Sequence, residues 1–376
     1  MKAIVSANLA LNVYSRKNLF LALQANGWEL HAAACADDGV SLLENELGIP
    51  FHTLPMNNKG KGILSDIRTF FAFLSLYKKL KPDAVLHYNS KPDIYGSIAA
   101  NILGIPAINN ITGLGSVYVG KETLVRKVVN FLYKIAFSGR KIHVFFQNTD
   151  DRSLFLSLKI VNEKKTGLLP GSGVDIKRFH PELNLSKNIK TNGPVQTTFL
   201  FASRLVLSKG IREFIEAAKI LKKEYENCHF EIIGELLSVT GFITEDELNV
   251  ATQTGVVKYL GNLKDASERI INCDCMVLPS YYREGVPRIL LEAAAMGKPL
   301  IAANSIGTKE PVEHGVNGFL CEPQSTEDLV IQMKKFMSLS TEEQSTMGKE
   351  SRQIAETRYS DTIISQSYLK ILGGLK

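Results

Sequence analysis

The sequence predicts an α/β protein with two doubly wound, Rossmann-like domains in series. Short apolar runs alternate with amphipathic helical patterns along most of the chain, which is typical of βαβ units and parallel sheets. One polar stretch near the middle interrupts this alternation, which then restarts. The length of 376 residues allows two or three domains at roughly 150 residues each, and the single interruption favours two.

The first half is expected to form one doubly wound sheet. Short apolar runs predict strands at 2–7, 29–35, 83–88, 105–110, 142–147 and 166–170. Apolar residues at helical spacing predict helices near 15–26, 65–80, 92–103 and 122–138. Residues 182–196 are polar and contain Gly193-Pro194, so we interpret them as the linker between the domains.

The second half repeats this architecture without repeating its residues. Strands are predicted near 197–202, 229–234, 256–260, 274–278 and 299–302. Helices are predicted near 211–224, 265–272, 287–296 and 326–338. A last amphipathic helix, Ser360 to Leu372, could pack on either domain.

Composition excludes several classes of protein. With 45% hydrophobic and 22% charged residues, the chain is neither disordered nor of low complexity. Its five scattered cysteines favour a reducing compartment, and we interpret Cys273 and Cys275 as core residues on one face of a strand. No signal-peptide stretch follows Met1, and no apolar cluster approaches the roughly 18 residues that cross a bilayer. Any contact with a membrane is therefore expected from the side.

The net charge of +6 is unevenly distributed. The first 185 residues hold 22 Lys and Arg against 14 Asp and Glu, whereas the remainder holds 22 against 24. A basic half suggests an anionic partner, such as a phospholipid surface or a diphosphate, and scattered solvated lysines are the alternative. The overall charge is too mild to indicate nucleic acid.

The segment 279–297 carries the richest chemistry, between a predicted strand and a predicted helix. Pro287 suits the first helical position. Gly285 lets a ligand approach the backbone, and the N–H groups at the helix start attract an anion. Glu284 and Glu292 can reach opposite ends of one elongated ligand, and sugar hydroxyls suit carboxylates that would repel phosphate. The segment predicts a site for a phosphate-bearing molecule.

A second segment, 203–210, also lies between a strand and a helix. Two cations on this loop, Arg204 and Lys209, suit a diphosphate whose leaving charge must be neutralised. Taken alone, the segment is more readily interpreted as a pair of surface cations at a loop.

Together these segments resemble the shared motifs of retaining family 4 glycosyltransferases of the GT-B fold, in order and spacing over essentially the whole chain. The segments that carry the resemblance are Glu284 to Glu292, Arg204 with Lys209, and residues 171–179. Residues 91–96 and 111–115 further resemble bacterial enzymes that extend undecaprenyl-diphosphate-linked oligosaccharides for O-antigen, capsule or glycoprotein glycans.

The resemblance implies two facing domains with an interdomain cleft. Residues 1–185, joined by the C-terminal helix at about 360–376, would bind the acceptor, and residues 186–359 would bind the donor. The implied reaction is retaining transfer of a sugar, an N-acetylhexosamine such as GalNAc, from a UDP-sugar to a lipid-linked saccharide. Its implied catalytic residues are Glu284 at the donor sugar, with Lys209 and Arg204 at the diphosphate. The implied donor-binding residues are Glu292, Gly285, Val286, Pro287, Leu260 and Gly173.

No cofactor or metal is expected. The chain lacks the Asp-x-Asp motif of metal-dependent transferases, its histidines show no metal-ligand spacing, and two cations can stabilise the departing diphosphate.

The acceptor side departs from the family pattern. The side chains expected there are Lys91, Tyr88, His87, Gly113, Gly115 and Asn8. Asn8 lies where many relatives have a Gly-Gly pair, and Tyr88 matches the position of a family histidine better than His87. For His87, a structural role inside the strand is the alternative.

Residues 124–141 combine an apolar stripe with several cations. Such a stripe is either core or a basic amphipathic face that docks on anionic lipid. The expected partners are therefore a nucleotide-sugar, a lipid-linked saccharide and an anionic inner-membrane surface, with no nucleic acid. The expected location is cytoplasmic, peripheral on the cytoplasmic face of the inner membrane.

Other functions remain open on the sequence. A UDP-sugar epimerase or a soluble-acceptor transferase would share the fold. An NAD-dependent oxidoreductase would need Gly-x-Gly-x-x-Gly after a first strand, which neither residues 1–11 nor 197–209 supply. A non-catalytic nucleotide-sugar-binding module would keep the diphosphate-binding cations without needing Glu284.

Overall fold

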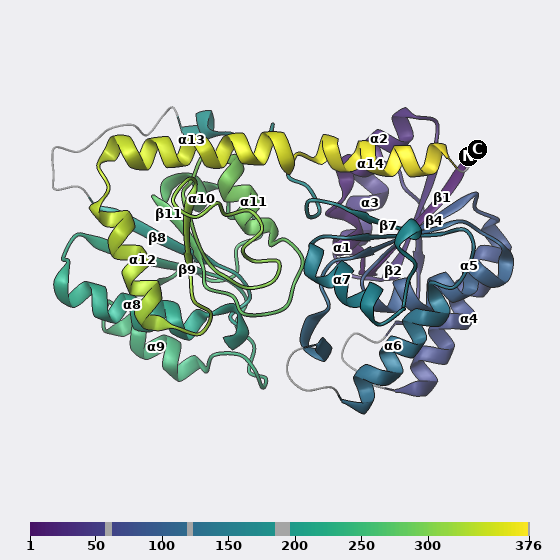
Figure 1. Ribbon diagram of the computed structural model, residues 1–376, viewed down its shortest axis with the longest axis horizontal. Coiled ribbons are helices and arrows are strands. Elements are labelled where there is room, and N and C mark those ends of the chain that lie inside the picture. The colour runs from purple at the N-terminus through teal and green to yellow at the C-terminus, as the bar shows by residue number, and fades with distance from the viewer. Residues whose placement is uncertain (57–61, 119–122, 185–195, 375–376) are drawn as a thin grey trace. The chain divides into compact units, whose positions relative to one another are not determined.

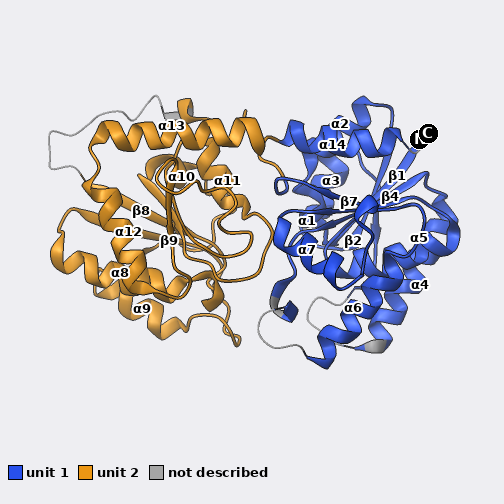
Figure 2. Ribbon diagram, in the orientation of Figure 1, with its two compact units in different colours: residues 1–172, 361–376 blue, residues 173–360 orange. Residues whose placement is uncertain are grey.

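A computed structural model describes residues 1–56, 62–118, 123–184 and 196–374. The chain divides into two compact units, residues 1–172 with 361–376 and residues 173–360 (Figure 2). Most of the linker expected at 182–196 lies outside the described residues.

The boundary between the units lies at 172/173, before the expected 185/186. The boundary is earlier than expected because residues 174–179 form hydrogen bonds with residues 352–359, which belong to the second unit. The Val174 N–H donates to the Tyr359 carbonyl at 2.9 Å, and the Arg352 guanidinium donates to the carbonyls of Ile176 and Phe179.

Unit 1 contains a seven-stranded parallel sheet in the order β3-β2-β1-β4-β5-β6-β7. The strands are β1 (Lys2–Leu9), β2 (Glu29–Cys35), β3 (Phe51–Thr53), β4 (Ala84–Tyr88), β5 (Ala107–Ile111), β6 (Ile142–Phe146) and β7 (Thr166–Leu168). β3 was not predicted, because it contains a single apolar residue, Phe51.

Helices cover both faces of this sheet (Figure 1). One face carries α1 (Ala10–Tyr14), α2 (Lys17–Ala25), α3 (Gly39–Leu47) and α14 (Asp361–Gly373). The other carries α4 (Ile63–Leu80), α5 (Ser97–Leu103), α6 (Leu124–Ala136) and α7 (Thr149–Ser157). Short turns η1 (Pro92–Gly96), η2 (Gly115–Tyr118) and η3 (Glu163–Lys165) complete the unit. The helix predicted at 92–103 is split, because η1 is a π-helical turn.

The C-terminal helix α14 packs in unit 1. The Tyr368 ring lies 6.2 Å from that of Tyr88 and 5.2 Å from that of Phe145, between centroids. Its hydroxyl accepts a hydrogen bond from Asn110 Nδ2 at 3.0 Å. The last helix therefore closes the core of the first sheet.

Unit 2 contains a six-stranded parallel sheet in the order β10-β9-β8-β11-β12-β13. The strands are β8 (Thr197–Ala202), β9 (Cys228–Ile233), β10 (Lys258–Tyr259), β11 (Cys275–Leu278), β12 (Leu300–Ala303) and β13 (Gly318–Cys321). The helices are α8 (Ile211–Glu224), α9 (Glu245–Gln253), α10 (Ser267–Asn272), α11 (Arg288–Ala295), α12 (Thr326–Ser338) and α13 (Thr341–Arg358), with short turns η4 (Pro181–Asn184) and η5 (Leu207–Lys209).

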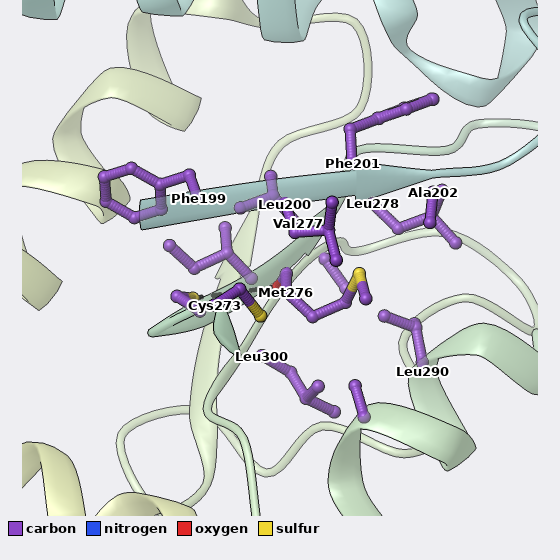
Figure 3. Packing of buried hydrophobic residues seen from close by; sticks show 14 of the residues in the cluster. Phe199, Leu200, Phe201, Ala202, Cys273, Met276, Val277, Leu278, Leu290 and Leu300 are labelled. Atoms are coloured by element: carbon purple, nitrogen blue, oxygen red, sulfur yellow. Dashed lines mark hydrogen bonds between the residues drawn. The ribbon is translucent and has the colours of Figure 1, made fainter. Parts of the chain in front are cut away.

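The core of unit 2 is built from β8 and β11. Phe199, Phe201 and Val277 are fully buried there with Leu290 of α11 (Figure 3). Cys275 is a buried core residue of β11, but Cys273 precedes the strand as the C-cap of α10. The two cysteines are thus buried, as expected, without both belonging to the strand.

Both sheets have the doubly wound order, so each has one point where the direction of winding reverses. In unit 1 this switch point lies between β1 and β4, and in unit 2 between β8 and β11. Ligands of such sheets bind at the carboxyl ends of the strands beside the switch point.

Candidate functional site

Lys209 and Glu284 meet at the switch point of unit 2. Lys209 ends η5 after β8, and Glu284 lies in the loop after β11. Lys209 Nζ lies 2.5 Å from Glu284 Oε2, and the two side chains are only 11% and 17% exposed. The structure therefore pairs two of the three predicted catalytic residues in a site that is mostly shielded from solvent.

Two neighbouring side chains fix this pair. Ser280, fully buried, donates its hydroxyl to Glu284 Oε1 at 2.9 Å, so both carboxylate oxygens of Glu284 have a partner. The Tyr282 ring lies with its centroid 5.5 Å from Lys209 Nζ, within the range of a cation–π contact. Neither residue was predicted, because contacts made by loop side chains follow no sequence period.

The loops that carry Lys209 and Glu284 are bonded to each other. The N–H groups of Tyr281 and Tyr282 both donate to the Ser208 carbonyl at 3.0 Å. Gly210 has a φ of +81°, and a Cβ there would lie 2.3 Å from the Pro279 carbonyl oxygen. Only glycine lets the two loops approach this closely.

The three residues after Glu284 are enclosed by the rest of unit 2, since Gly285, Val286 and Pro287 are all buried. α11 begins at Arg288, one residue later than predicted, with Pro287 as its N-cap. The N-terminus of α11 thus follows directly on the loop that holds Glu284.

Glu292 lies in the second turn of α11. Its carboxylate is 3.6 Å from the Arg288 guanidinium. Burial raises the pKa of Glu292, and the charges of Arg288 and Arg178 oppose this shift. A ligand that donates hydrogen bonds to this buried carboxylate would stabilise its charged form.

The other predicted donor residues differ in position. The Leu260 N–H donates to the Ile232 carbonyl at 2.9 Å, which places Leu260 just beyond β10, at the same sheet edge as Lys209. Arg204 lies on the loop after β8 with an exposed side chain. Gly173, by contrast, begins unit 2, next to the bridge between Val174 and Ser360.

On the acceptor side, Asn8 lies at the switch point of unit 1. Its N–H donates to Asn89 Oδ1 at 3.2 Å, and Asn89, after β4, has a φ of +73°. Lys91 follows on the same loop and pairs with Asp66 of α4 at 3.0 Å. β1 and β4 therefore present amide groups at the carboxyl ends of neighbouring strands.

His87 is enclosed within unit 1. It is fully buried, Tyr77 Oη lies 2.7 Å from Nε2, and Asn109 Oδ1 lies 2.9 Å from Nδ1. Burial lowers the pKa of His87 to about 4, so the ring is neutral near pH 7. A Cβ on Gly96 would lie 2.6 Å from Nε2. These contacts favour the structural role over a role at the acceptor.

Tyr88 is also buried, on the opposite face of β4. The Arg16 guanidinium lies 3.8 Å from the centroid of its ring. Gly113 and Gly115 have φ of +113° and +64° and are half-buried, Gly113 in the loop after β5 and Gly115 at the start of η2. The predicted acceptor residues thus share one sheet edge, but Tyr88 and His87 face into the core.

Asp93 is a residue that the sequence did not single out. It is buried in η1. Burial raises the pKa of Asp93 well above its ordinary value. A single Asp after Pro92 gave no signal, because only the fold reveals its burial.

Comparison with known proteins identifies the family. Residues 186–354 match the model of glycosyl transferases group 1. The chain is 30% identical over 319 residues, 81% of this chain and 80% of the relative, to the N,N'-diacetylbacillosaminyl-diphospho-undecaprenol alpha-1,3-N-acetylgalactosaminyltransferase of Campylobacter jejuni. The chain belongs to the group 1 glycosyltransferases. This confirms the family that the Glu284–Glu292 and Arg204–Lys209 motifs predicted.

Another sequence relative and two solved structures are also similar to this chain. The UDP-Gal:alpha-D-GlcNAc-diphosphoundecaprenol alpha-1,3-galactosyltransferase of Escherichia coli is 28% identical over 271 residues, 69% of this chain and 67% of that protein. A glycosyltransferase from Rickettsia africae superimposes with a TM-score of 0.78, at 19% identity over 100% of this chain and 98% of that one. Anabaena HepE, solved with UDP, gives 0.76 at 20% identity, with complete coverage of both chains. The fold of this glycosyltransferase is GT-B, as the sequence predicted.

Proposed function

We propose that this glycosyltransferase moves an N-acetylhexosamine, with GalNAc as the first candidate, from a UDP-sugar to a saccharide carried on undecaprenyl diphosphate. The product would serve surface polysaccharide or glycan assembly. The observation that carries the proposal is the shielded Lys209–Glu284 pair at the switch point of unit 2. The Campylobacter and Escherichia relatives, which act on such acceptors by name, support the choice of acceptor.

The site supplies the groups that such a transfer needs. Lys209 and Arg204 would bind the diphosphate and stabilise its charge as the bond to the sugar breaks. Glu284 would accept from a hydroxyl of the donor sugar, and Glu292 from the ribose hydroxyls. The acceptor hydroxyl would attack on the face that the diphosphate leaves and pass its proton to the departing phosphate oxygen, which retains the stereochemistry at the anomeric carbon. No metal is required in this scheme.

We also propose that the protein works peripherally, at the anionic cytoplasmic face of the inner membrane, where a lipid-linked acceptor is accessible. No helix among residues 1–56, 62–118, 123–184 and 196–374 is long and apolar enough to cross a bilayer. Nucleic acid is not among the proposed partners.

Two measurements test the proposal. A panel of nucleotide-sugars is first screened for thermal stabilisation of the full chain, because a ligand that binds only the folded state raises the melting temperature. The stabilising donor is then incubated with an undecaprenyl-diphosphate-linked monosaccharide, and the product is analysed by mass spectrometry and NMR. We expect one added sugar with retained configuration. Transfer only to a soluble sugar, or interconversion of two UDP-sugars without transfer, would overturn the proposed acceptor or reaction.

A further inference from the structure

The apolar stripe of α6 divides into two faces in the structure. Val129, Leu132, Tyr133 and Ala136 pack into the core of unit 1. A second set points outward, and its most exposed members are Leu124 at 78% and Phe131 at 64%. The outward set consists of Leu124, Val125, Val128, Phe131 and Ile135.

The outward residues form one continuous strip. At 100° per residue, Leu124, Val128, Phe131 and Ile135 fall within roughly 60° of the helix circumference. A surface helix ordinarily presents polar residues there. An apolar strip of this length on the outside of a helix indicates a surface that meets something apolar.

α4 carries a similar strip. Its outward residues Leu64, Ile67 and Phe71 follow the spacing i, i+3, i+7, and Leu64 is 84% exposed. α4 and α6 both pack against η1 and α5, and their buried residues share one core cluster. The two helices therefore lie on the same face of the first sheet (Figure 1).

Positive charge borders the α6 strip. Residues 123–141 contain five Lys and Arg and no Asp or Glu. Lys127 and Lys134 are one heptad apart, so they flank the same side of the strip, and Arg140 and Lys141 follow the helix with exposed side chains. Arg68 accompanies the strip on α4.

We infer that the outward strips of α6 and α4, with their bordering cations, form the surface by which this glycosyltransferase docks on an anionic phospholipid bilayer. Apolar side chains of such a helix enter the boundary between headgroups and acyl chains, while long basic side chains reach the headgroup phosphates. A second copy fits this face less well, because a twofold axis would bring the same cations together. The inference deepens the proposed function, since docking would bring unit 1 to a lipid-linked acceptor.

Vesicle sedimentation of the full chain tests the surface without any acceptor. We expect wild type to bind vesicles of phosphatidylcholine with phosphatidylglycerol more strongly than vesicles of phosphatidylcholine alone. K134Q and R140Q should each lower this binding about fivefold, as expected for one basic residue near an anionic surface. V128Q/F131Q should abolish binding to both kinds of vesicle. The matched control is I331Q/K335Q, on exposed positions of α12, which should bind as wild type does.

Two further readouts separate this inference from the proposed function. Transfer to a short-chain, water-soluble analogue of the acceptor should be unchanged in V128Q/F131Q, whereas transfer in vesicles should fall with vesicle binding. If wild type binds vesicles but transfers no sugar, the proposed function fails and the docking surface stands. Equal binding of wild type to both vesicles would overturn the surface. A concentration-dependent dimer that V128Q/F131Q abolishes would also overturn it, as would an acidic protein partner lost with the same variant.

Discussion

Lys209 Nζ lies 2.5 Å from Glu284 Oε2, between loops that follow the two strands of the unit 2 switch point. Each charge is largely shielded from water and has the other as its counterion. A nucleotide diphosphate that binds Lys209 must therefore compete with Glu284, and the carboxylate so released becomes available to a sugar hydroxyl. Binding of a donor's diphosphate at Lys209 and binding of its sugar at Glu284 are therefore coupled.

We expect K209A to lower kcat/KM about 100- to 1000-fold, as loss of one preorganised charge at a leaving group does. E284Q should also be severely impaired, with kcat affected more than donor affinity. UDP release during transfer measures both. K223A, at an exposed position of α8 in the same unit, is the control. Turnover near that of wild type in K209A would refute the assignment of the donor site.

Gly210 allows a second test, because two independent features require a glycine there: its φ of +81° and its closeness to Pro279. G210A should lose stability through backbone strain of about 1–2 kcal/mol and, in addition, separate the loops of Lys209 and Glu284. The control is G255A, since Gly255 has a φ of +69° but no atom within 4 Å of its Cβ position. We expect both variants to melt at lower temperature and only G210A to lose UDP affinity. Equal UDP affinity in the two variants would show that the close approach is unimportant.

Metal independence is a third prediction. Lys209 and Arg204 lie on one loop and can supply the positive charge that a diphosphate leaving group requires. Transfer should therefore continue after exhaustive chelation with EDTA. A loss of activity that added Mn²⁺ or Mg²⁺ restores would contradict it.

The sequence predicts most of this fold because parallel strands buried on both faces are continuous apolar runs. β8 and β11 are examples, and their runs are visible at 197–202 and 274–278. The strands β3 and β13 were not predicted, because β3 has a single apolar residue, Phe51, and β13 begins with a glycine, a residue depleted in strands. The helix predicted at 92–103 contains a π-helical turn, which no apolar spacing reveals.

The candidate site was predictable to the extent that its residues lie in one segment of chain. Glu284 and Glu292 share a loop and its helix, so their spacing carries the signal. Ser280 contacts Glu284 within one loop, and Tyr282 contacts Lys209 across two loops, and neither contact follows a sequence period. The outward face of α6 was visible as an apolar stripe, but which part of the stripe is covered depends on neighbouring elements.

His87 gives a prediction on stability. Burial lowers its pKa in the folded protein to about 4, against about 6.5 in the unfolded chain. The unfolded chain therefore takes up a proton first as pH falls, and the free energy of unfolding decreases from about pH 6.5 towards pH 4. H87Q should lack this part of the decrease, while its transfer rate near pH 7 stays within a few-fold of wild type. Urea unfolding across this pH range measures it, with H180Q as the control at a partly exposed histidine.

A collapse of transfer in H87Q at neutral pH, with folding intact, would instead assign His87 to the reaction. If the free energy of unfolding depended on pH in H87Q as it does in wild type, His87 would not be the group whose protonation lowers stability.

Glu292 gives the last prediction, in which stability and binding move in opposite directions. Its pKa is raised by burial, so the folded state retains a proton that the unfolded state loses near its ordinary value of about 4.3. The free energy of unfolding of wild type therefore falls as pH rises from that value to the raised one, and E292Q escapes this loss. The E292Q variant should therefore melt at a higher temperature than wild type above this pH range, with no such gain in strong acid.

The UDP affinity of E292Q should fall about tenfold, because hydrogen bonds to a charged acceptor are stronger than those to an amide. Calorimetric titration with UDP and melting curves across pH test both effects, and E226Q, at an exposed glutamate, is the control. Unchanged UDP affinity in E292Q would remove Glu292 from the donor site, whatever its effect on stability.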